Sequence, residues 1–197
     1  ALTRVTDTLG NTTVITYDDI GRKITMTDPD LGTWSYEYDN AGNLIRQTDA
    51  RTGPNKSICF CYDELNRLTG KDYVDSTTCP TPLTPDVTYT YDDTSGGNLG
   101  KGLRTGMSDL SGTTAWKYDA RGRTIGETKV ISGTGGGTFW TQWSYDPQDR
   151  VTTLTYPGGN GGQAGEAVTT GYGKWGQPAT LTGSFNYVVK ALPDEAG

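Results

Sequence analysis

The segment Tyr17-Asp18-Asp19-Ile20-Gly21-Arg22 is one copy of a phrase that recurs along this 197-residue chain. The phrase is tyrosine, aspartate, two variable residues, a turn residue and usually arginine. Further copies begin at Tyr38, Tyr62, Tyr91, Tyr118 and Tyr145, with a weaker one at Tyr172. Subtraction of the tyrosine numbers gives spacings of 21, 24, 29, 27, 27 and 27 residues. Because a period of roughly 20–50 residues is typical of repeat architectures, this phrase decides the fold.

Each copy reads as a tight turn. In five copies the fifth position is Gly21, Gly42, Asn66, Gly122 or Asp149, residue types that best tolerate a positive φ. A glycine-rich insertion over residues 94–102 interrupts the copy at Tyr91. The aspartate three residues earlier is placed to accept a hydrogen bond from a turn amide. The repeated arginines are expected to pair with aspartates of the turns or of neighbouring strands. The residues of this turn signature are Tyr17, Asp18, Gly21, Arg22, Tyr38, Asp39, Gly42, Tyr62, Asp63, Asn66, Arg67, Tyr91, Asp92, Tyr118, Asp119, Gly122, Arg123, Tyr145, Asp146, Asp149 and Arg150.

The residues before each turn alternate between large and small or polar, as in Trp34, Tyr36 and Tyr38 against Ser35 and Glu37. This period of two predicts half-buried strands. A second turn signal, Asp-x-x-Gly, lies upstream of several copies, for example Asp7–Gly10. Strands joined by tight turns run antiparallel, so the sequence predicts an all-β antiparallel meander of hairpins. We expect the repeats over residues 1–183 and an irregular tail or last strand over 184–197, with no helix.

The phrase Y-D-x-x-G-R, its spacing and the upstream Asp-x-x-Gly resemble the YD-repeat (Rhs-repeat) family over roughly residues 5–182. That resemblance implies a curved or spiralling sheet that forms part of a shell, as in Rhs polymorphic toxins, insecticidal toxin complexes, wall-associated proteins and teneurins. It implies a C-terminal toxin as cargo, and a bacterial protein that is secreted or at the cell surface. The chain starts with Ala1 inside a repeat, so we expect its partners to be the rest of a larger parent chain or copies of itself.

Three cysteines leave several arrangements open. Cys59 and Cys61 are two residues apart and therefore share one face of a strand, and Cys79 lies in a proline-rich insertion over residues 74–86. A disulfide between Cys79 and either Cys59 or Cys61 is expected in an oxidising compartment. Three free thiols are the main alternative. A metal site is disfavoured because no fourth ligand is evident.

Composition limits the classes of function. The formal net charge of −6 disfavours a nucleic-acid partner, because phosphate binding requires a basic face. The chain has no histidine, which removes the commonest general base and every Ser-His or Cys-His arrangement. We therefore expect no catalytic residue, cofactor or metal. No run of residues has transmembrane length.

The aromatic residues carry two interpretations. In the first, the repeat tyrosines stack on neighbouring strands and stabilise the sheet. In the second, exposed tryptophans form a platform for a glycan, with Trp34, Trp116 and Trp143 as its candidate site residues and Trp140 and Trp175 as further members. The leading hypothesis is a non-enzymatic structural segment that encloses or displays a C-terminal effector. The alternative is an extracellular module that binds carbohydrate or a cell surface, or that self-assembles into a surface filament.

Overall fold

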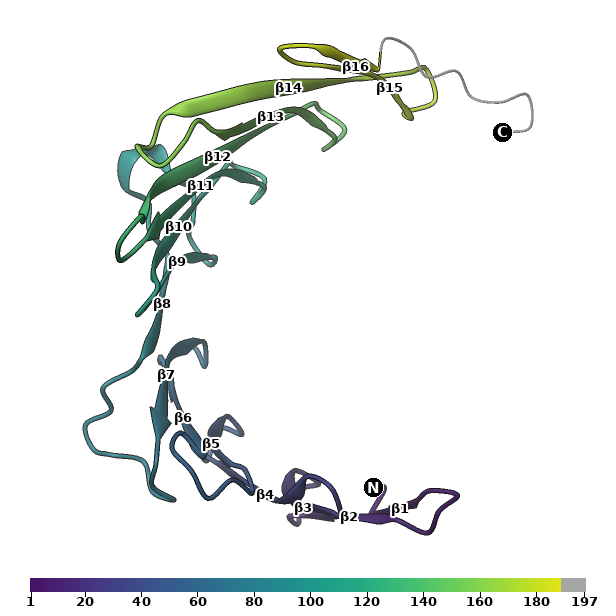
Figure 1. The fold of residues 1–197 in the computed structure, drawn as a ribbon, viewed down its shortest axis with the longest axis vertical. Coiled ribbons are helices and arrows are strands. Elements are labelled where there is room, and N and C mark those ends of the chain that lie inside the picture. The colour runs from purple at the N-terminus through teal and green to yellow at the C-terminus, as the bar shows by residue number, and fades with distance from the viewer. Residues whose placement is uncertain (189–197) are drawn as a thin grey trace. The chain divides into compact units, whose positions relative to one another are not determined.

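The computed structural model describes residues 1–188 as a series of β-strands joined by turns and loops (Figure 1). The strands are β1 (Arg4–Thr6), β2 (Thr12–Tyr17), β3 (Lys23–Asp28), β4 (Gly32–Tyr38), β5 (Leu44–Thr48), β6 (Ser57–Tyr62), β7 (Leu68–Val74), β8 (Val87–Tyr91), β9 (Arg104–Asp109), β10 (Gly112–Tyr118), β11 (Thr124–Ile131), β12 (Gly137–Tyr145), β13 (Val151–Pro157), β14 (Ala164–Tyr172), β15 (Pro178–Thr182) and β16 (Asn186–Val188). One 3-10 turn, η1 (Ser95–Gly97), lies between β8 and β9. None of the described residues forms a helix long and apolar enough to cross a membrane.

The strands follow one another in the sheet in sequence order, from β1 to β16, without a crossover. The predicted all-β antiparallel meander is confirmed. β16 lies inside the segment 184–197, for which a tail or last strand was expected, and residues 189–197 of that segment lie outside the described residues. The chain divides into two compact units, which we call unit 1 (Ala1–Thr88) and unit 2 (from Tyr89 onward).

Each complete hairpin of the tyrosine–aspartate phrase contains a β-bulge at the same place. The register shifts between the residue before the tyrosine and the tyrosine itself, as at Thr16/Tyr17 in unit 1 and Ser144/Tyr145 in unit 2. A bulge inserts one extra residue and increases the local twist of the strand. The sequence predicted that the strands after the turns begin at the arginine that ends the phrase, at Arg22 and Arg150, and this is wrong. The arginine belongs to the turn, because β3 begins at Lys23 and β13 at Val151.

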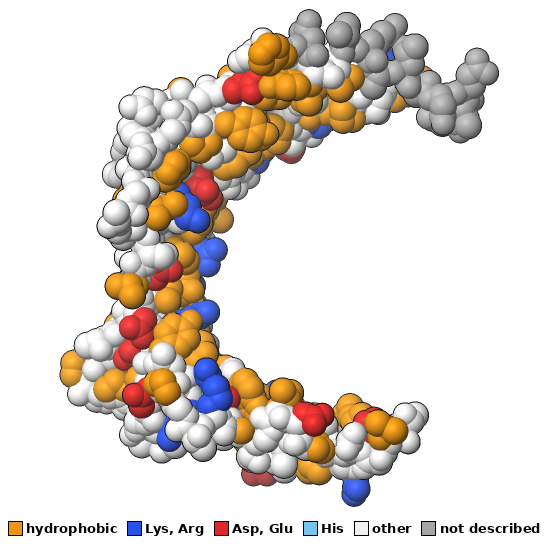
Figure 2. Space-filling view, viewed as in Figure 1, with side chains coloured by type: hydrophobic (Ala, Val, Ile, Leu, Met, Phe, Trp, Pro, Cys, Tyr) orange, Lys and Arg blue, Asp and Glu red, His pale blue; other side chains and the backbone are white. Residues whose placement is uncertain are grey.

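The face opposite the aromatic residues carries aligned hydroxyl groups. In unit 1 the register places five of them in one row across five strands, and the Oγ atoms of Thr48 and Ser57 are 2.8 Å apart. Cross-strand hydroxyl pairs of this kind stabilise a sheet without apolar burial. Unit 2 is also asymmetric: Figure 2 shows hydrophobic (orange) and charged (blue and red) side chains gathered on one side of its sheet, while the other side is mostly white, the colour of the remaining side chains and the backbone. The unit 1 row consists of Thr16, Thr25, Ser35, Thr48 and Ser57.

The best-buried side chains lie where a long loop folds back onto the sheet. In unit 1 the loop between β7 and β8 covers Cys59, which is fully buried, and Asp72, which is 5% exposed. The Asp72 carboxylate accepts a hydrogen bond from the amide of Thr84 in that loop. The proline-rich insertion therefore supplies a local second layer, and glycine is needed at position 70 because a Cβ there would lie 2.8 Å from Pro85.

In unit 2 the loop between β8 and β9 has the same effect. Asn98 is 2% exposed, and its side chain pairs with the backbone of β10. Its Nδ2 donates to the carbonyl of Trp116 at 3.0 Å, and its Oδ1 accepts from the amide of Tyr118 at 2.9 Å. At the end of β10, the Asn98 side chain thus makes the two backbone hydrogen bonds that a neighbouring strand would otherwise make.

Candidate functional site

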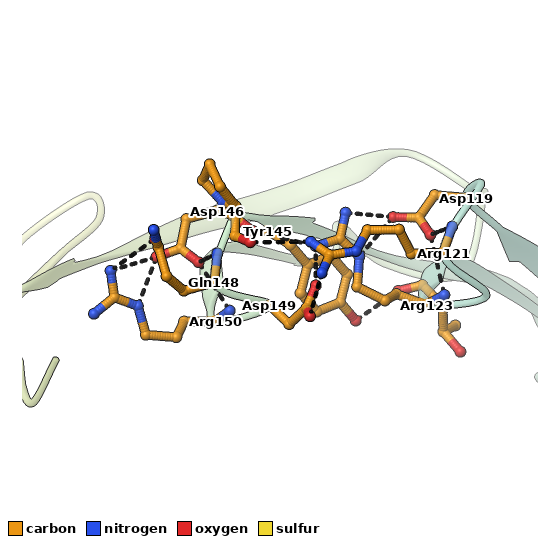
Figure 3. Close-up of polar contacts among 10 residues, drawn as sticks. Asp119, Arg121, Arg123, Tyr145, Asp146, Gln148, Asp149 and Arg150 are labelled. Atoms are coloured by element: carbon orange, nitrogen blue, oxygen red, sulfur yellow. Dashed lines mark hydrogen bonds and ion pairs between the residues drawn. The ribbon is translucent and has the colours of Figure 1, made fainter.

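The repeated turn is held together by its aspartate. Asp119 Oδ1 accepts hydrogen bonds from the amides of Arg121 at 2.9 Å and Arg123 at 3.1 Å, and Oδ2 accepts from Arg123 Nε at 2.7 Å (Figure 3). The amide of Asp119 donates to the carbonyl of Arg123, which closes the turn. One carboxylate thereby satisfies two turn amides and one guanidinium. The same set of contacts is present around Asp18, Asp63 and Asp146.

The fifth residue of the phrase is in the left-handed region in every complete copy. Its φ is +86° at Gly21, +91° at Gly42, +59° at Asn66, +74° at Gly122 and +65° at Asp149. Only glycine adopts this conformation without strain, while asparagine and aspartate tolerate it. In the interrupted copy, the positive φ of 64° falls instead at Asp92, whose carboxylate accepts a hydrogen bond from the amide of Gly102.

Consecutive turns are joined by a tyrosine and an arginine. The Tyr145 hydroxyl donates to the carbonyl of Thr124 at 2.7 Å, and the guanidinium of Arg123 lies 4.6 Å from the centre of the Tyr145 ring. Arg123 also donates to the carbonyl of Asp146 at 3.2 Å. Arg123 therefore reaches forward to the following hairpin and Tyr145 reaches back to the preceding one, and Figure 3 shows Arg123 between the two turns. We call this set of contacts the Tyr–Arg link.

The Tyr–Arg link recurs in both units. The hydroxyls of Tyr38 and Tyr172 donate to the carbonyls of Lys23 and Val151, and each acceptor is the residue that follows the arginine of the preceding turn. Arg22 lies over Tyr38 at 4.8 Å, and Arg150 lies over Tyr172 at 4.3 Å. Further hydroxyl bonds join Tyr17 to Leu2, Tyr62 to Leu44 and Tyr118 to Arg104.

The interpretation of the tyrosines as a stack on neighbouring strands is wrong. Tyr17 lies on β2 and Tyr38 on β4, so β3 separates them. Alternate strands are about 9.6 Å apart, since neighbouring strands are about 4.8 Å apart. That distance exceeds the roughly 4.5–7 Å at which aromatic rings interact. The intervening arginine fills this space.

Ion pairs strengthen the contact between the turns at 119–123 and 146–150. Asp149 forms ion pairs with Arg121 at 2.8 Å and with Arg123 at 2.7 Å. In unit 1, Asn43 replaces the arginine, and its Nδ2 donates to both Asp39 and Asn66 at 2.9 and 2.8 Å. An uncharged amide therefore also links consecutive turns.

Removal of the Tyr145 hydroxyl tests the Tyr–Arg link. We expect Tyr145→Phe to lower the free energy of unfolding by about 1 kcal/mol, because the Thr124 carbonyl loses its donor and the ring stays in place. Tyr156→Phe is the matched control, since that ring is 47% exposed. Urea denaturation of the two variants measures the difference. Equal stability of the two variants would contradict the link.

Acid will weaken the turns. The hydrogen bond from Arg123 lowers the pKa of Asp119, and the hydrogen bond from Asn43 lowers the pKa of Asp39. A carboxyl group whose folded pKa is depressed stabilises the fold above the unfolded value of about 3.9, and this contribution disappears as the pH falls through the folded pKa. We therefore expect Tm to fall between about pH 5 and about pH 2.

The variant Asp119→Asn is the control for the dependence of Tm on pH. It lacks the titrating carboxyl group, so its Tm should depend less steeply on pH than the Tm of the unchanged chain. Thermal melts followed by circular dichroism over that pH range make the comparison. The same pH dependence in both proteins would show that Asp119 does not contribute.

The structure joins Cys59 and Cys79 by a disulfide and leaves Cys61 as a free thiol. The bond connects β6 to the loop between β7 and β8, both within unit 1. Burial raises the pKa of the Cys61 thiol, and the nearby charge of Asp72 raises it further. Among residues 1–188, no group of three or more Cys, Asp or Glu side chains is placed to hold a metal ion.

The three tryptophans of the expected glycan platform have different surroundings. The Nε1 of Trp34 donates to the carbonyl of Leu31 at 3.1 Å, and the ring borders an open hollow of about 670 Å³. Trp116 donates to Glu127 at 2.9 Å, and Arg104 lies 5.1 Å from its ring centre, so one face of that ring is covered. Trp143 follows Thr141 on β12, on the same face as Trp116.

Residues 118–160 match the family model named RHS Repeat, and this span contains two of the turns joined by the Tyr–Arg link. Residues 118–160 are an RHS repeat. A comparison with curated proteins finds no match. The RHS-repeat resemblance expected from the phrase is confirmed.

Solved structures share the fold of this chain. The crystal structure of TcdB2-TccC3-TEV has a TM-score of 0.63 and 14% identity, and the match covers 91% of this chain and 11% of that one. TcdB2-TccC3-Cdc42 has a TM-score of 0.59 and 14% identity, with 87% and 10% covered. TcdB2-TccC3 without its hypervariable C-terminal region has a TM-score of 0.55 and 12% identity, with 90% and 12% covered. The chain thus spans about a tenth of the chains that it matches.

Proposed function

We propose that this chain is a section of a β-sheet strip within a larger RHS-repeat protein, and that its role is structural and not enzymatic. The observation that carries the proposal is the Tyr–Arg link, which joins the hairpins of Tyr38, Tyr145 and Tyr172 to the preceding turns by the same hydroxyl, carbonyl and guanidinium contacts. A unit that contacts only its neighbours can be added in series, as in other repeat proteins. Residues 1–183 form this repeat region.

The strip encloses or displays an effector encoded C-terminal to it in the parent chain. Two findings support this step. The chain covers about a tenth of the matched structures, and one of those structures is described as lacking a hypervariable C-terminal region. A sheet that is continued by further strands also avoids the open edges that promote aggregation. The family resemblance supports the further proposal that such a protein is bacterial and is secreted or lies at the cell surface.

The intact mass of the native polypeptide, combined with limited proteolysis, tests this role. We expect a mass several times that of the 197-residue chain, and a protease-resistant core that contains the RHS repeats and protects a C-terminal segment. A mass near that of the 197-residue chain would overturn the single-chain shell. A large mass with a fully digested C-terminal segment would overturn enclosure but not the repeat strip.

A second candidate is an extracellular module that binds a glycan or cell surface, or that assembles with copies of itself as a filament. The hollow beside Trp34 favours the glycan version, because Asp30, Asp49 and Arg51 place polar groups around an aromatic ring. A glycan array that compares the chain with its Trp34→Ala variant tests it. No bound glycan, or equal binding by both proteins, would remove this candidate.

A further inference from the structure

A hollow of about 400 Å³ lies on the sheet of unit 2 over the strands β13 to β16, which follow one another in the sheet (Figure 1). Its two outer strands each contribute a phenol ring, and the strands between them contribute one carboxylate and two apolar side chains. The lining residues are Tyr156 on β13, Glu166 and Val168 on β14, Leu181 on β15 and Tyr187 on β16.

A bulge and a glycine bring Tyr187 and Glu166 together, although β15 lies between their strands. Tyr187 has no partner in the register of β15 with β16 and is the extra residue of a β-bulge. A Cβ at Gly183 would lie 2.6 Å from Glu166 Oε1 and 3.2 Å from Tyr187 Cε2, so glycine leaves room for the two side chains to meet. The Tyr187 hydroxyl donates to Glu166 Oε1 at 2.6 Å, and the amide of Ser184 donates to the same oxygen at 2.7 Å. These contacts fix the carboxylate in the hollow.

The carboxylate of Glu166 is charged and has no counter-ion within the described part of the chain. The hydrogen bond from Tyr187 lowers the pKa of Glu166, so the carboxylate is ionised at neutral pH. No lysine or arginine of residues 1–188 pairs with it. The two rings of the hollow are accessible, Tyr156 at 47% exposure and Tyr187 at 49%. Because the face of an aromatic ring is electronegative, this combination attracts a cation.

The lining favours a quaternary ammonium over other cations. A primary ammonium has three N–H donors, whereas Glu166 Oε1 already accepts two hydrogen bonds. A calcium ion takes six to eight oxygen ligands, and the hollow supplies one carboxylate. Val168 and Leu181 offer only apolar surface. A quaternary ammonium has a positive charge, apolar methyl groups and no donor on its nitrogen, and aromatic rings are the usual protein groups that recognise it.

We propose that this hollow binds a quaternary ammonium group such as that of choline. The charge of the ligand lies beside Glu166 and the two phenol rings, and its methyl groups contact Val168 and Leu181. The volume is within the range of about 300–1,000 Å³ that is usual for small-molecule sites. The proposal depends neither on the role of the chain as a shell section nor on the hollow beside Trp34.

Titration calorimetry of the 197-residue chain with choline chloride tests the site. We expect binding in the millimolar range, and much weaker binding of neohexyl alcohol, the uncharged analogue in which carbon replaces the nitrogen of choline. Glu166→Gln and Tyr156→Leu should each weaken the binding of choline about tenfold, which corresponds to about 1.4 kcal/mol. Tyr156→Phe keeps an aromatic ring and should bind choline as the unchanged chain does.

Free choline and the headgroup of a choline lipid carry the same quaternary ammonium. Sedimentation with phosphatidylcholine vesicles, and with phosphatidylglycerol vesicles for comparison, separates these two sources. Sedimentation with phosphatidylcholine alone, prevented by Glu166→Gln, would assign the group to a lipid. Binding of free choline without sedimentation would assign it to a soluble ligand. Either result supports the site.

Two variants are matched controls. Glu64→Gln removes the same charge from an exposed turn of unit 1, and Thr169→Ala changes β14 on the face opposite Val168. Both should bind choline as the unchanged chain does, and circular dichroism checks that every variant is folded. If Tyr156→Leu does not fold, Glu166→Gln carries the test, because glutamine keeps an oxygen that accepts hydrogen bonds. No binding of choline, equal binding of neohexyl alcohol, or unchanged binding by Glu166→Gln would overturn the proposal.

Discussion

Replacement of Gly112 by alanine should lower the free energy of unfolding by about 3 kcal/mol or more. Gly112 has a φ of +143°, and a Cβ at this position would lie 1.8 Å from the carbonyl oxygen of Val130. That oxygen belongs to the backbone of β11, so no side-chain rotation relieves the overlap. β10 and β11 would have to separate at their open end, where Gly112 pairs with Ile131, and would lose their register there.

Gly10→Ala is the matched control for this prediction. Gly10 ends another Asp-x-x-Gly segment and has a φ of +90°, but nothing lies within 4 Å of a Cβ built there. Its substitution should cost only the strain of the left-handed backbone, about 1–2 kcal/mol. Urea denaturation of both variants gives the comparison. Equal losses would mean that backbone strain, and not the contact with Val130, determines the need for Gly112.

Cys79→Ser should lower the free energy of unfolding of unit 1 by about 3 kcal/mol. The disulfide from Cys59 to Cys79 closes a loop with a sequence separation of 20, and its removal frees the unfolded chain of that restraint. The same change releases the loop that carries Cys79 from β6. Water can then reach Cys59, which is fully buried beneath that loop. The loss should appear as a lower urea concentration at the midpoint of denaturation.

A reducing agent separates this disulfide from the alternatives. The stability of the unchanged chain and of Cys61→Ser should fall in dithiothreitol, whereas that of Cys79→Ser should stay the same. Peptide mapping after alkylation should recover Cys61 as the modified residue. A Cys61–Cys79 peptide, or no effect of dithiothreitol on the unchanged chain, would show that the pairing differs from the one in the structure.

Much of the fold follows from local patterns. The alternation in segments such as Trp34–Tyr38 predicts strands, and the turn signals between them predict the antiparallel order that the structure has. The positions with positive φ, such as Gly21 and Asn66, can also be identified this way, because only a few residue types tolerate that conformation.

The contacts within the candidate sites could not be predicted from local sequence patterns. No local signal showed that Tyr145 donates to Thr124, that Asn98 replaces a strand beside β10, or that one face carries aligned hydroxyls. The Tyr–Arg link becomes visible only when the strand register is known, because pairing of β11 with β12 brings Tyr145 beside Arg123 and Thr124.

The sequence by itself determined the strands, the turns and their order, because these depend on dihedral preferences and hydrogen bonds within about five residues. Only the tertiary structure decided which groups meet across the sheet. Tyr145 and Thr124 are 21 residues apart, and Tyr187 and Glu166 come together through the register of three strands with a bulge beside them. A shift of one residue in that register would turn every side chain to the other face, so the sites depend on the packing that selects it.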